Sequence, residues 1–232
     1  MTILYINGDS HSAAAEAVNP HCFAEDDGQL WYMGRAPHPD NARVSWGAQL
    51  AALAKLNLKL DAESASSNAR IIRTTREWFR ENKHDDVLAI IQWSTWEREE
   101  WNIDGTWYQV NASGIDIVPE DYQVRYKEYI AGIDWMAKTI QAHEEIWLLH
   151  QWLNDRGIKH IFFNGNNTFK KIIDRYEWGA SYIDPYSDNT YNNWLISQGY
   201  QTVTPTSYHF GADAHQAWAK YLLKHIAQNR LI

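Results

Sequence analysis

A Gly-Asp-Ser turn follows the first apolar stretch of the chain. Residues 3–6 read Ile-Leu-Tyr-Ile, and Gly8, Asp9 and Ser10 follow after one asparagine. A short, continuous apolar run that ends near a glycine predicts a buried strand of a parallel sheet. Ligands of open α/β sheets bind at the carboxyl ends of the strands. We therefore predict that Ser10 is a nucleophile, although the tripeptide alone is a weak motif.

A histidine near the far end of the chain supplies the matching base. His209 lies in the segment Ser-Tyr-His-Phe-Gly (207–211), after the last predicted strand and before the last predicted helix. Parallel strands bring this segment to the same sheet edge as Ser10. A serine hydroxyl needs a base, and the ordinary pKa of histidine suits that role at neutral pH. We expect Ser10 and His209 to lie within about 4 Å of each other, and His215, in the following helix, to lie further away.

The polar and apolar patterns predict strands that alternate with helices. The predicted strands cover residues 3–6, 58–60, 87–91, 158–163 and 201–204; the predicted helices cover 13–18, 119–156, 189–198 and 213–229, and two more begin near 45 and 68. A hairpin is expected around Asp104-Gly105. Alternation of this kind predicts a parallel sheet with helices on both faces. We therefore predict one domain over residues 1–232, a three-layer α/β/α sandwich with a five-stranded parallel sheet.

Composition argues against several classes of partner. The formal net charge of −8 disfavours nucleic acid and anionic membrane surfaces. The longest apolar runs, such as 87–91, are far too short to span a bilayer. No signal peptide is visible, and Cys22 is the single cysteine, so we expect a cytoplasmic protein.

The sequence predicts neither a metal nor another cofactor. It contains no His-Glu-x-x-His or Cys-x-x-Cys spacing and no glycine-rich phosphate loop followed by lysine. The remaining metal alternative is a site formed by His11, His21 and His38 near one loop.

The Gly8–Ser10 turn and the segment that follows His209 together resemble the SGNH hydrolases, also called GDSL esterases and lipases. Their last block places a helix with alanines after the catalytic histidine, as Ala214 and Ala219 stand here. The resemblance covers nearly the whole chain. It implies a flavodoxin-like strand order 2-1-3-4-5, with Ser10 as nucleophile and His209 as base.

Three positions depart from the pattern of that family. Thr206 stands where the acid is expected, three residues before His209, so a carboxylate must come from elsewhere, with Asp184 and Asp213 as candidates. Asp213 could alternatively pair with His215. Ala65 replaces the glycine whose backbone N–H helps to bind the oxyanion. The Gly-x-Asn block is missing, so Ser94, Thr95 or Asn68 is expected to supply a further donor.

Arginines follow the central predicted strand and recur on one predicted helix. Arg98 either lines the pocket, where it pairs with substrate or a buried acid, or forms a surface ion pair with a neighbouring glutamate. Arg70, Arg73 and Arg76 are spaced by three residues. We expect Arg73 and Arg76 to lie on a solvated helix face.

Taken together, these residues favour a serine ester hydrolase that acts through a Ser-His dyad or an incomplete triad. The 13 tryptophans and the long loop that contains Trp31 and Tyr32 suggest a small or carbohydrate-linked acyl ester as substrate. The departures leave two alternatives: a binding or structural protein that has lost hydrolytic competence, and an acyltransferase on the same fold.

Overall fold

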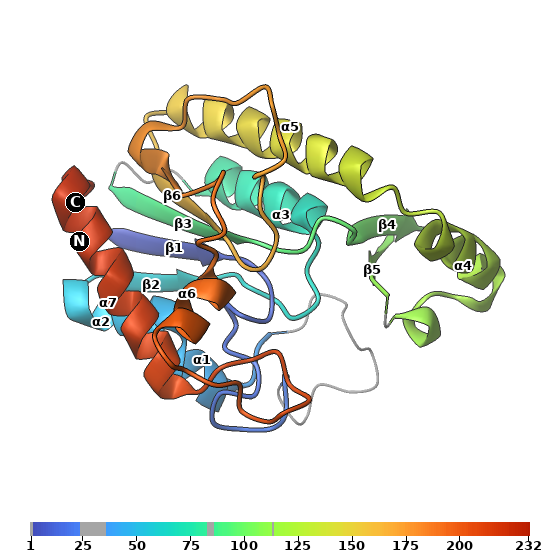
Figure 1. The fold of residues 1–232 in the computed structure, drawn as a ribbon, viewed down its shortest axis with the longest axis horizontal. Helices are drawn as coiled ribbons and strands as arrows, with labels where there is room; N and C mark the ends of the chain where they lie inside the picture. Colours follow the sequence, from blue (N-terminus) through green and yellow to red (C-terminus); the bar gives the residue numbers. More distant parts are fainter. Residues whose placement is uncertain (1, 24–35, 83–85, 113) are drawn as a thin grey trace.

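Five parallel strands form the central sheet of the protein (Figure 1). The computed structural model describes residues 2–23, 36–82, 86–112 and 114–232, so Trp31 and Tyr32 lie outside the described residues. The strands are β1 (Ile3–Asn7), β2 (Asn57–Leu60), β3 (Val87–Trp93), β6 (Lys159–Asn164) and β7 (Tyr182–Ile183). Their order is β2-β1-β3-β6-β7, which confirms the predicted order 2-1-3-4-5.

Two helical layers cover the sheet (Figure 1). One face packs against α2 (Trp46–Ala54), α6 (Tyr191–Ser197) and α7 (Ala212–Asn229), and the other against α3 (Asn68–Glu81) and α5 (Trp135–Asn154). Successive side chains of a strand point to opposite faces of the sheet. Ile90 of β3 therefore packs in the core with α2, α6 and α7, and Ile91 packs in the core with α3 and α5. Every residue of β3 is buried, as expected for a strand covered on both sides.

Short helix α1 (Pro39–Val44) precedes α2, and an excursion separates β3 from α5. The excursion contains β4 (Glu99–Ile103), β5 (Thr106–Val110) and α4 (Gln123–Ala131), and it lies to one side of the main sheet (Figure 1). β4 and β5 pair antiparallel, which confirms the predicted hairpin. Its turn residues Asp104 and Gly105 both have positive φ, 50° and 85°, as a two-residue hairpin turn of type I′ requires.

Three predicted elements differ from the structure. The fifth strand is β7 rather than 201–204, where Thr202 forms only an isolated bridge with Phe210. Residues 13–18 form turns instead of a helix, because Ala14 and Glu16 adopt φ values of 55° and 63°. The segment 119–156 divides into a 3-10 turn (Glu120–Tyr122), α4 and α5, because α4 ends at Gly132 and the side chain of Asp134 caps α5.

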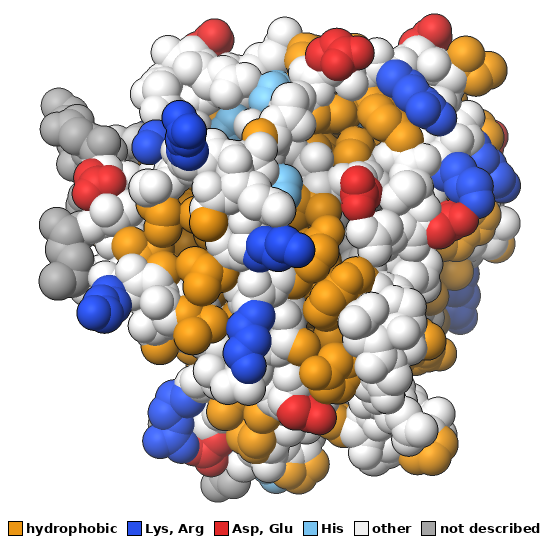
Figure 2. All heavy atoms as spheres, turned by 60° about the vertical axis from the view of Figure 1, so that its left-hand side comes forward, with side chains coloured by type: hydrophobic (Ala, Val, Ile, Leu, Met, Phe, Trp, Pro, Cys, Tyr) orange, Lys and Arg blue, Asp and Glu red, His pale blue; other side chains and the backbone are white. Residues whose placement is uncertain are grey.

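The face that carries α7 and α2 has a mixed surface. Figure 2 shows hydrophobic side chains that reach this surface in several separate areas, between scattered Lys and Arg side chains. None of the helices in the described ranges is long and apolar enough to cross a membrane.

Candidate active site

The Gly8–Ser10 turn is rigid and presents a free hydroxyl. The N–H groups of Ser12 and Ala13 both donate to the carbonyl of Asp9 at 3.0 Å. A Cβ at Gly8 would lie 2.4 Å from Ser12 Oγ, so this position requires glycine. Ser10 is largely buried at 8% exposure, and its Oγ makes no hydrogen bond within the described part of the chain. The hydroxyl is therefore available for chemistry.

Asp9 is a buried anion beneath this turn. Its carboxylate accepts hydrogen bonds from Ser94 Oγ at 2.8 Å and from the His11 N–H at 3.0 Å, and it pairs with Arg98 Nη1 at 3.4 Å. Burial alone would raise the pKa of Asp9, but the electrostatic interactions with His11 and with the Arg98 guanidinium, together with the hydrogen bonds, lower it. The structure thus places Arg98 against a buried acid one residue from Ser10, rather than in an ion pair with a neighbouring glutamate.

His209 is held by Glu16. His209 Nδ1 lies 2.6 Å from Glu16 Oε2, which also accepts a hydrogen bond from Ser207 Oγ at 2.6 Å. The backbone N–H of His209 donates to the same Ser207 hydroxyl at 3.0 Å. Partial burial raises the pKa of Glu16, but the hydrogen bonds from His209 and Ser207 outweigh burial and lower it. Glu16 is therefore ionised at neutral pH and orients the imidazole.

The carboxylate beside His209 is thus neither of the two expected ones. Asp213 Oδ1 accepts from the N–H of Ala214 at the start of α7, and Asp184 Oδ2 accepts from the side chain of Asn189. Glu16 is 193 residues from His209 in the sequence, and no spacing rule connects them. The turns that replace the expected helix at 13–18 place the side chain of Glu16 against the His209 loop.

The two neighbouring histidines are neutral. The His11 ring lies edge-on to the His209 ring at 5.4 Å between centroids, which brings His209 beside the residue after Ser10. Burial lowers the pKa of His11 to about 4. His215 Nδ1 accepts the backbone N–H of Trp46 at 3.2 Å, and burial lowers its pKa to about 3. His215 is therefore a structural group of α7, and no pair forms between it and Asp213.

Two backbone N–H groups lie in the turns that form the site. Ala65 has a φ of 66°, the left-handed region that glycine adopts without strain. The backbone N–H groups of Ser10 and Ala65 donate to no other described residue. Ala65 therefore adopts a backbone conformation that glycine favours, and its N–H stays available as a donor.

The expected side-chain donors are engaged elsewhere. Ser94 Oγ donates to Asp9, and Thr95 Oγ1 donates to Glu97 at 2.9 Å. Asn68 accepts the N–H of Ser94 at 2.9 Å, and its Nδ2 lies 3.4 Å from the carbonyl of Ser94. Ser94 and Asn68 connect the end of β3 to the start of α3 and to the buried anion, whereas Thr95 bonds only the nearby Glu97.

A cavity of about 200 Å³ adjoins this network. It is lined by Asn68, Ala69, Trp96, Arg98, Glu99, Glu100, Lys138, Gln141, Ala142 and Glu145. Neither Ser10 nor His209 lines it.

The described residues contain no group of three or more His, Cys, Asp or Glu side chains suited to a metal ion. His11 Nε2 instead contacts Asn166 at 3.2 Å, and His38 Nδ1 accepts the N–H of Asp40 at 3.2 Å.

Sequence comparison assigns the chain to a family. A profile described as "Family of unknown function (DUF6071)" matches residues 38–184, more than half of the chain. The chain belongs to this family. The matched region includes Ala65, Ser94 and Arg98 but not Ser10, Glu16 or His209. A comparison with curated proteins gives no significant match.

Comparison with solved structures establishes the fold. The psychrotrophic esterase EstA from a Pseudoalteromonas species covers 98% of both chains at 8% identity, with a TM-score of 0.50. The acetyl xylan esterase Est2A from Butyrivibrio proteoclasticus has a TM-score of 0.50 at 12% identity; the match covers 98% of this chain and 64% of Est2A. A lipolytic G-D-S-L family protein from Veillonella parvula covers 97% of both chains at 11% identity, with a TM-score of 0.48. The two matches at a TM-score of 0.50 show that the chain has the fold of these esterases, in agreement with the predicted SGNH-hydrolase-like α/β/α sandwich.

Proposed function

We propose that the protein is a serine ester hydrolase. Ser10 is the nucleophile, His209 the general base and Glu16 the acid that orients His209. The backbone N–H groups of Ser10 and Ala65 bind the oxyanion. The observation that carries this proposal is the short hydrogen bond between His209 Nδ1 and Glu16 Oε2, made by a histidine whose ring contacts the residue after Ser10.

These groups suit a two-step acyl transfer to water. Because the ionised Glu16 accepts the proton on Nδ1, the free Nε2 of His209 is the basic nitrogen that takes the proton of Ser10. Ser10 Oγ then attacks the acyl carbon, and the two backbone N–H groups stabilise the negative oxygen that forms. His209 returns the proton to the leaving alcohol, and the same groups activate a water molecule that releases the acid.

The substrate we propose is a small acyl ester, with a carbohydrate as one candidate for the alcohol. The abundance of tryptophan supports this class, because flat aromatic faces suit sugars. Est2A, which shares the fold, is an acetyl xylan esterase. The single Cys22 supports a reducing, cytoplasmic location.

Ester hydrolysis and covalent labelling test the nucleophile. The wild-type protein should hydrolyse p-nitrophenyl acetate, and a fluorophosphonate should label Ser10, as located by mass spectrometry. Ser10→Ala and His209→Ala should each lower kcat by about 10³-fold or more. Ser197→Ala and His21→Gln, both at exposed positions, are the matched controls and should keep the wild-type rate. A wild-type protein that neither hydrolyses the ester nor reacts at Ser10 would overturn the proposal.

One observation favours a binding protein as the second candidate. Ser94, Thr95 and Asn68 are all engaged, which leaves only the two backbone N–H groups as oxyanion donors among those expected. A protein of this kind would bind an ester or its acid without turnover. This alternative would be supported if the wild-type protein neither hydrolysed the ester nor reacted with the fluorophosphonate, but bound the intact ester in a calorimetric titration. An acyltransferase would instead form an acyl ester with an added alcohol faster than it releases the acid.

A further inference from the structure

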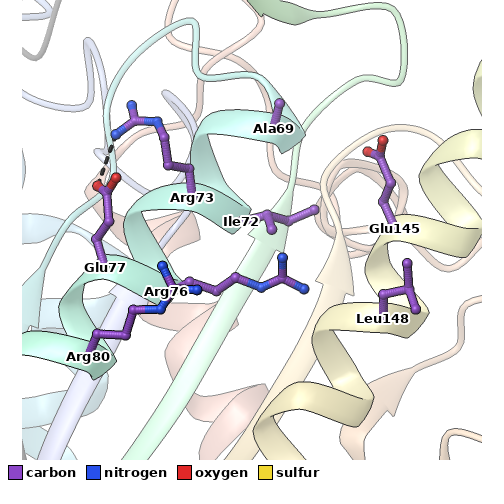
Figure 3. A pocket seen from close by; sticks show the side chains of 8 residues that line it. All are labelled: Ala69, Ile72, Arg73, Arg76, Glu77, Arg80, Glu145 and Leu148. Atoms are coloured by element: carbon purple, nitrogen blue, oxygen red, sulfur yellow. Dashed lines mark hydrogen bonds and ion pairs between the residues drawn. The ribbon is translucent and has the colours of Figure 1, made fainter.

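A second cavity, of about 390 Å³, lies between α3 and α5, and neither Ser10 nor His209 lines it. Figure 3 shows its walls. Its lining side chains are Ala69, Ile72, Arg73, Arg76, Glu77, Arg80, Glu145 and Leu148, and we call it the arginine pocket. Its volume lies within the range of small-molecule sites, about 300–1,000 Å³.

The first of the three arginines is neutralised within the protein. Arg73 makes a two-pronged contact with Glu100, through Nε to Oε2 at 2.9 Å and through Nη2 to Oε1 at 2.6 Å. Its Nη1 also pairs with Glu77 at 2.9 Å (Figure 3). Arg73 is therefore a structural link between α3 and β4; its side chain remains partly exposed, but it is paired rather than free on the predicted solvated face.

Arg76 has no such partner. Within the described residues it forms no ion pair with a carboxylate, and its Nε is buried without an acceptor. Burial and the nearby charges of Arg80 and Arg156 lower the pKa of Arg76, and only Glu145 counteracts them. Arg80 likewise pairs with no carboxylate in the described ranges. Two neighbouring cations on α3 thus lack an anionic partner among the described residues, in a chain whose net charge is −8.

The two ends of the pocket differ in charge. In Figure 3 the Arg76 side chain extends from α3 toward α5, whereas the Glu145 carboxylate points toward the end that holds Ala69. Glu145 and Ala69 also line the 200 Å³ cavity near Arg98. An anion placed between Arg76 and Arg80 would lie away from the Glu145 carboxylate, in a pocket that the apolar side chains of Ile72 and Leu148 also line.

We propose that the arginine pocket binds a small molecule that carries a phosphate or another tetrahedral oxyanion next to an apolar group. The guanidinium groups of Arg76 and Arg80 hold the oxyanion, because planar guanidinium donors match two oxygens of such a group at once. Ile72 and Leu148 contact the apolar part. The ligand is distinct from the ester that Ser10 would attack, so this site stands whether or not the protein is an esterase.

Calorimetric titration tests the pocket with phenyl phosphate, inorganic phosphate and phenol, at constant ionic strength so that general screening is equal. Phenyl phosphate should bind more tightly than inorganic phosphate, and phenol should not bind measurably. Arg76→Gln and Arg80→Gln should each weaken phenyl phosphate binding by about tenfold or more. Arg175→Gln, at an exposed arginine outside the pocket, is the matched control and should leave binding unchanged.

The apolar wall has its own test. Leu148→Ala should weaken the binding of phenyl phosphate but not of inorganic phosphate, because it removes only apolar contact. Leu148 is 55% exposed, so this variant should fold normally. Arg80 is also exposed, which keeps Arg80→Gln informative if Arg76→Gln is unstable. Unchanged binding in Arg80→Gln, or no binding of phenyl phosphate to the wild-type protein, would overturn the proposal.

Discussion

At the scale of single residues, Glu16 is the group that completes the proposed site. It bonds His209 at Nδ1, the nitrogen that the acid of a Ser-His-Asp system contacts, and its lowered pKa keeps it charged at neutral pH. Its backbone φ of 63° is unusual for glutamate. Such conformations cost about 1–3 kcal/mol and gather at functional sites.

Substitution of Glu16 gives a prediction for turnover. Glu16→Gln should lower kcat of ester hydrolysis by about 10²- to 10⁴-fold, because the amide no longer stabilises the imidazolium and can favour the wrong tautomer. Glu144→Gln, at an exposed glutamate of α5, is the control. A rate for Glu16→Gln within about twofold of wild type would show that His209 does not depend on this carboxylate.

Thr206 provides a rescue experiment at the position where the family pattern places the acid. Thr206→Asp alone should leave kcat unchanged, because Glu16 already occupies Nδ1 of His209. In the Glu16→Gln background the same substitution should raise kcat about tenfold or more, since it supplies a new carboxylate. Steady-state rates of the two single variants and the double variant decide this. A large gain in the wild-type background would instead mean that Glu16 is a poor acid.

At the scale of elements, the turn between β2 and α3 carries the proposed second oxyanion donor. Ser67 Oγ caps α3 by accepting the N–H of Arg70 at 3.2 Å, and Ala65 lies two residues earlier with positive φ. The helix therefore begins at a defined residue, which holds the preceding N–H groups in place. An L-residue in the left-handed region costs about 1–2 kcal/mol relative to its usual conformation.

Relief of this strain gives a stability prediction. Ala65→Gly should raise the free energy of unfolding by up to about 1 kcal/mol, because the gain in the folded state exceeds the added entropy of the unfolded chain. Esterase activity should persist, since the N–H remains. Ala62→Gly is the matched control: Ala62 is buried without positive φ, so this change should destabilise the protein. Urea unfolding measures both, and destabilisation by Ala65→Gly would contradict the strain argument.

At the scale of the whole molecule, buried neutral histidines set the response to acid. Burial lowers the pKa of His11 and of His160 to about 4 and that of His215 to about 3. In the unfolded chain these groups take up protons near pH 6.5. Between about pH 6.5 and pH 4 the unfolded state therefore binds more protons, and the free energy of unfolding falls as pH falls.

The slope of this fall is measurable. Each such histidine should contribute up to about 1.4 kcal/mol per pH unit to the change in the free energy of unfolding. Urea unfolding at pH 7, 6 and 5 measures the summed contribution. This window lies above the range in which Asp9 and Glu16, with lowered pKa values, take up protons. His215→Gln should reduce the slope of unfolding free energy against pH by the contribution of one histidine, whereas His21→Gln, at an exposed position, should not change it. A stability independent of pH between 7 and 5 would contradict the neutral, buried state of these groups.

The sequence by itself determined the sheet and the turn that carries Ser10. Continuous apolar runs predicted four of the five strands, because a strand that is buried on both faces has an almost unbroken apolar sequence. The strand order 2-1-3-4-5 was implied by the resemblance to SGNH hydrolases. The resemblance to SGNH hydrolases then indicated His209 and Ala65 as site positions. The fifth strand escaped prediction, since the two residues of β7 are too short to show a pattern.

Only the tertiary structure decided which carboxylate meets His209 and which arginines lack a partner. Glu16 reaches His209 because turns with positive φ replace a predicted helix, and the two residues are joined by folding rather than by spacing. Arg73 and Arg76 look alike in the sequence, yet one is neutralised by Glu100 and the other is not. Local sequence patterns record burial and backbone preference, whereas pairs of charges between distant segments depend on where the whole chain places them.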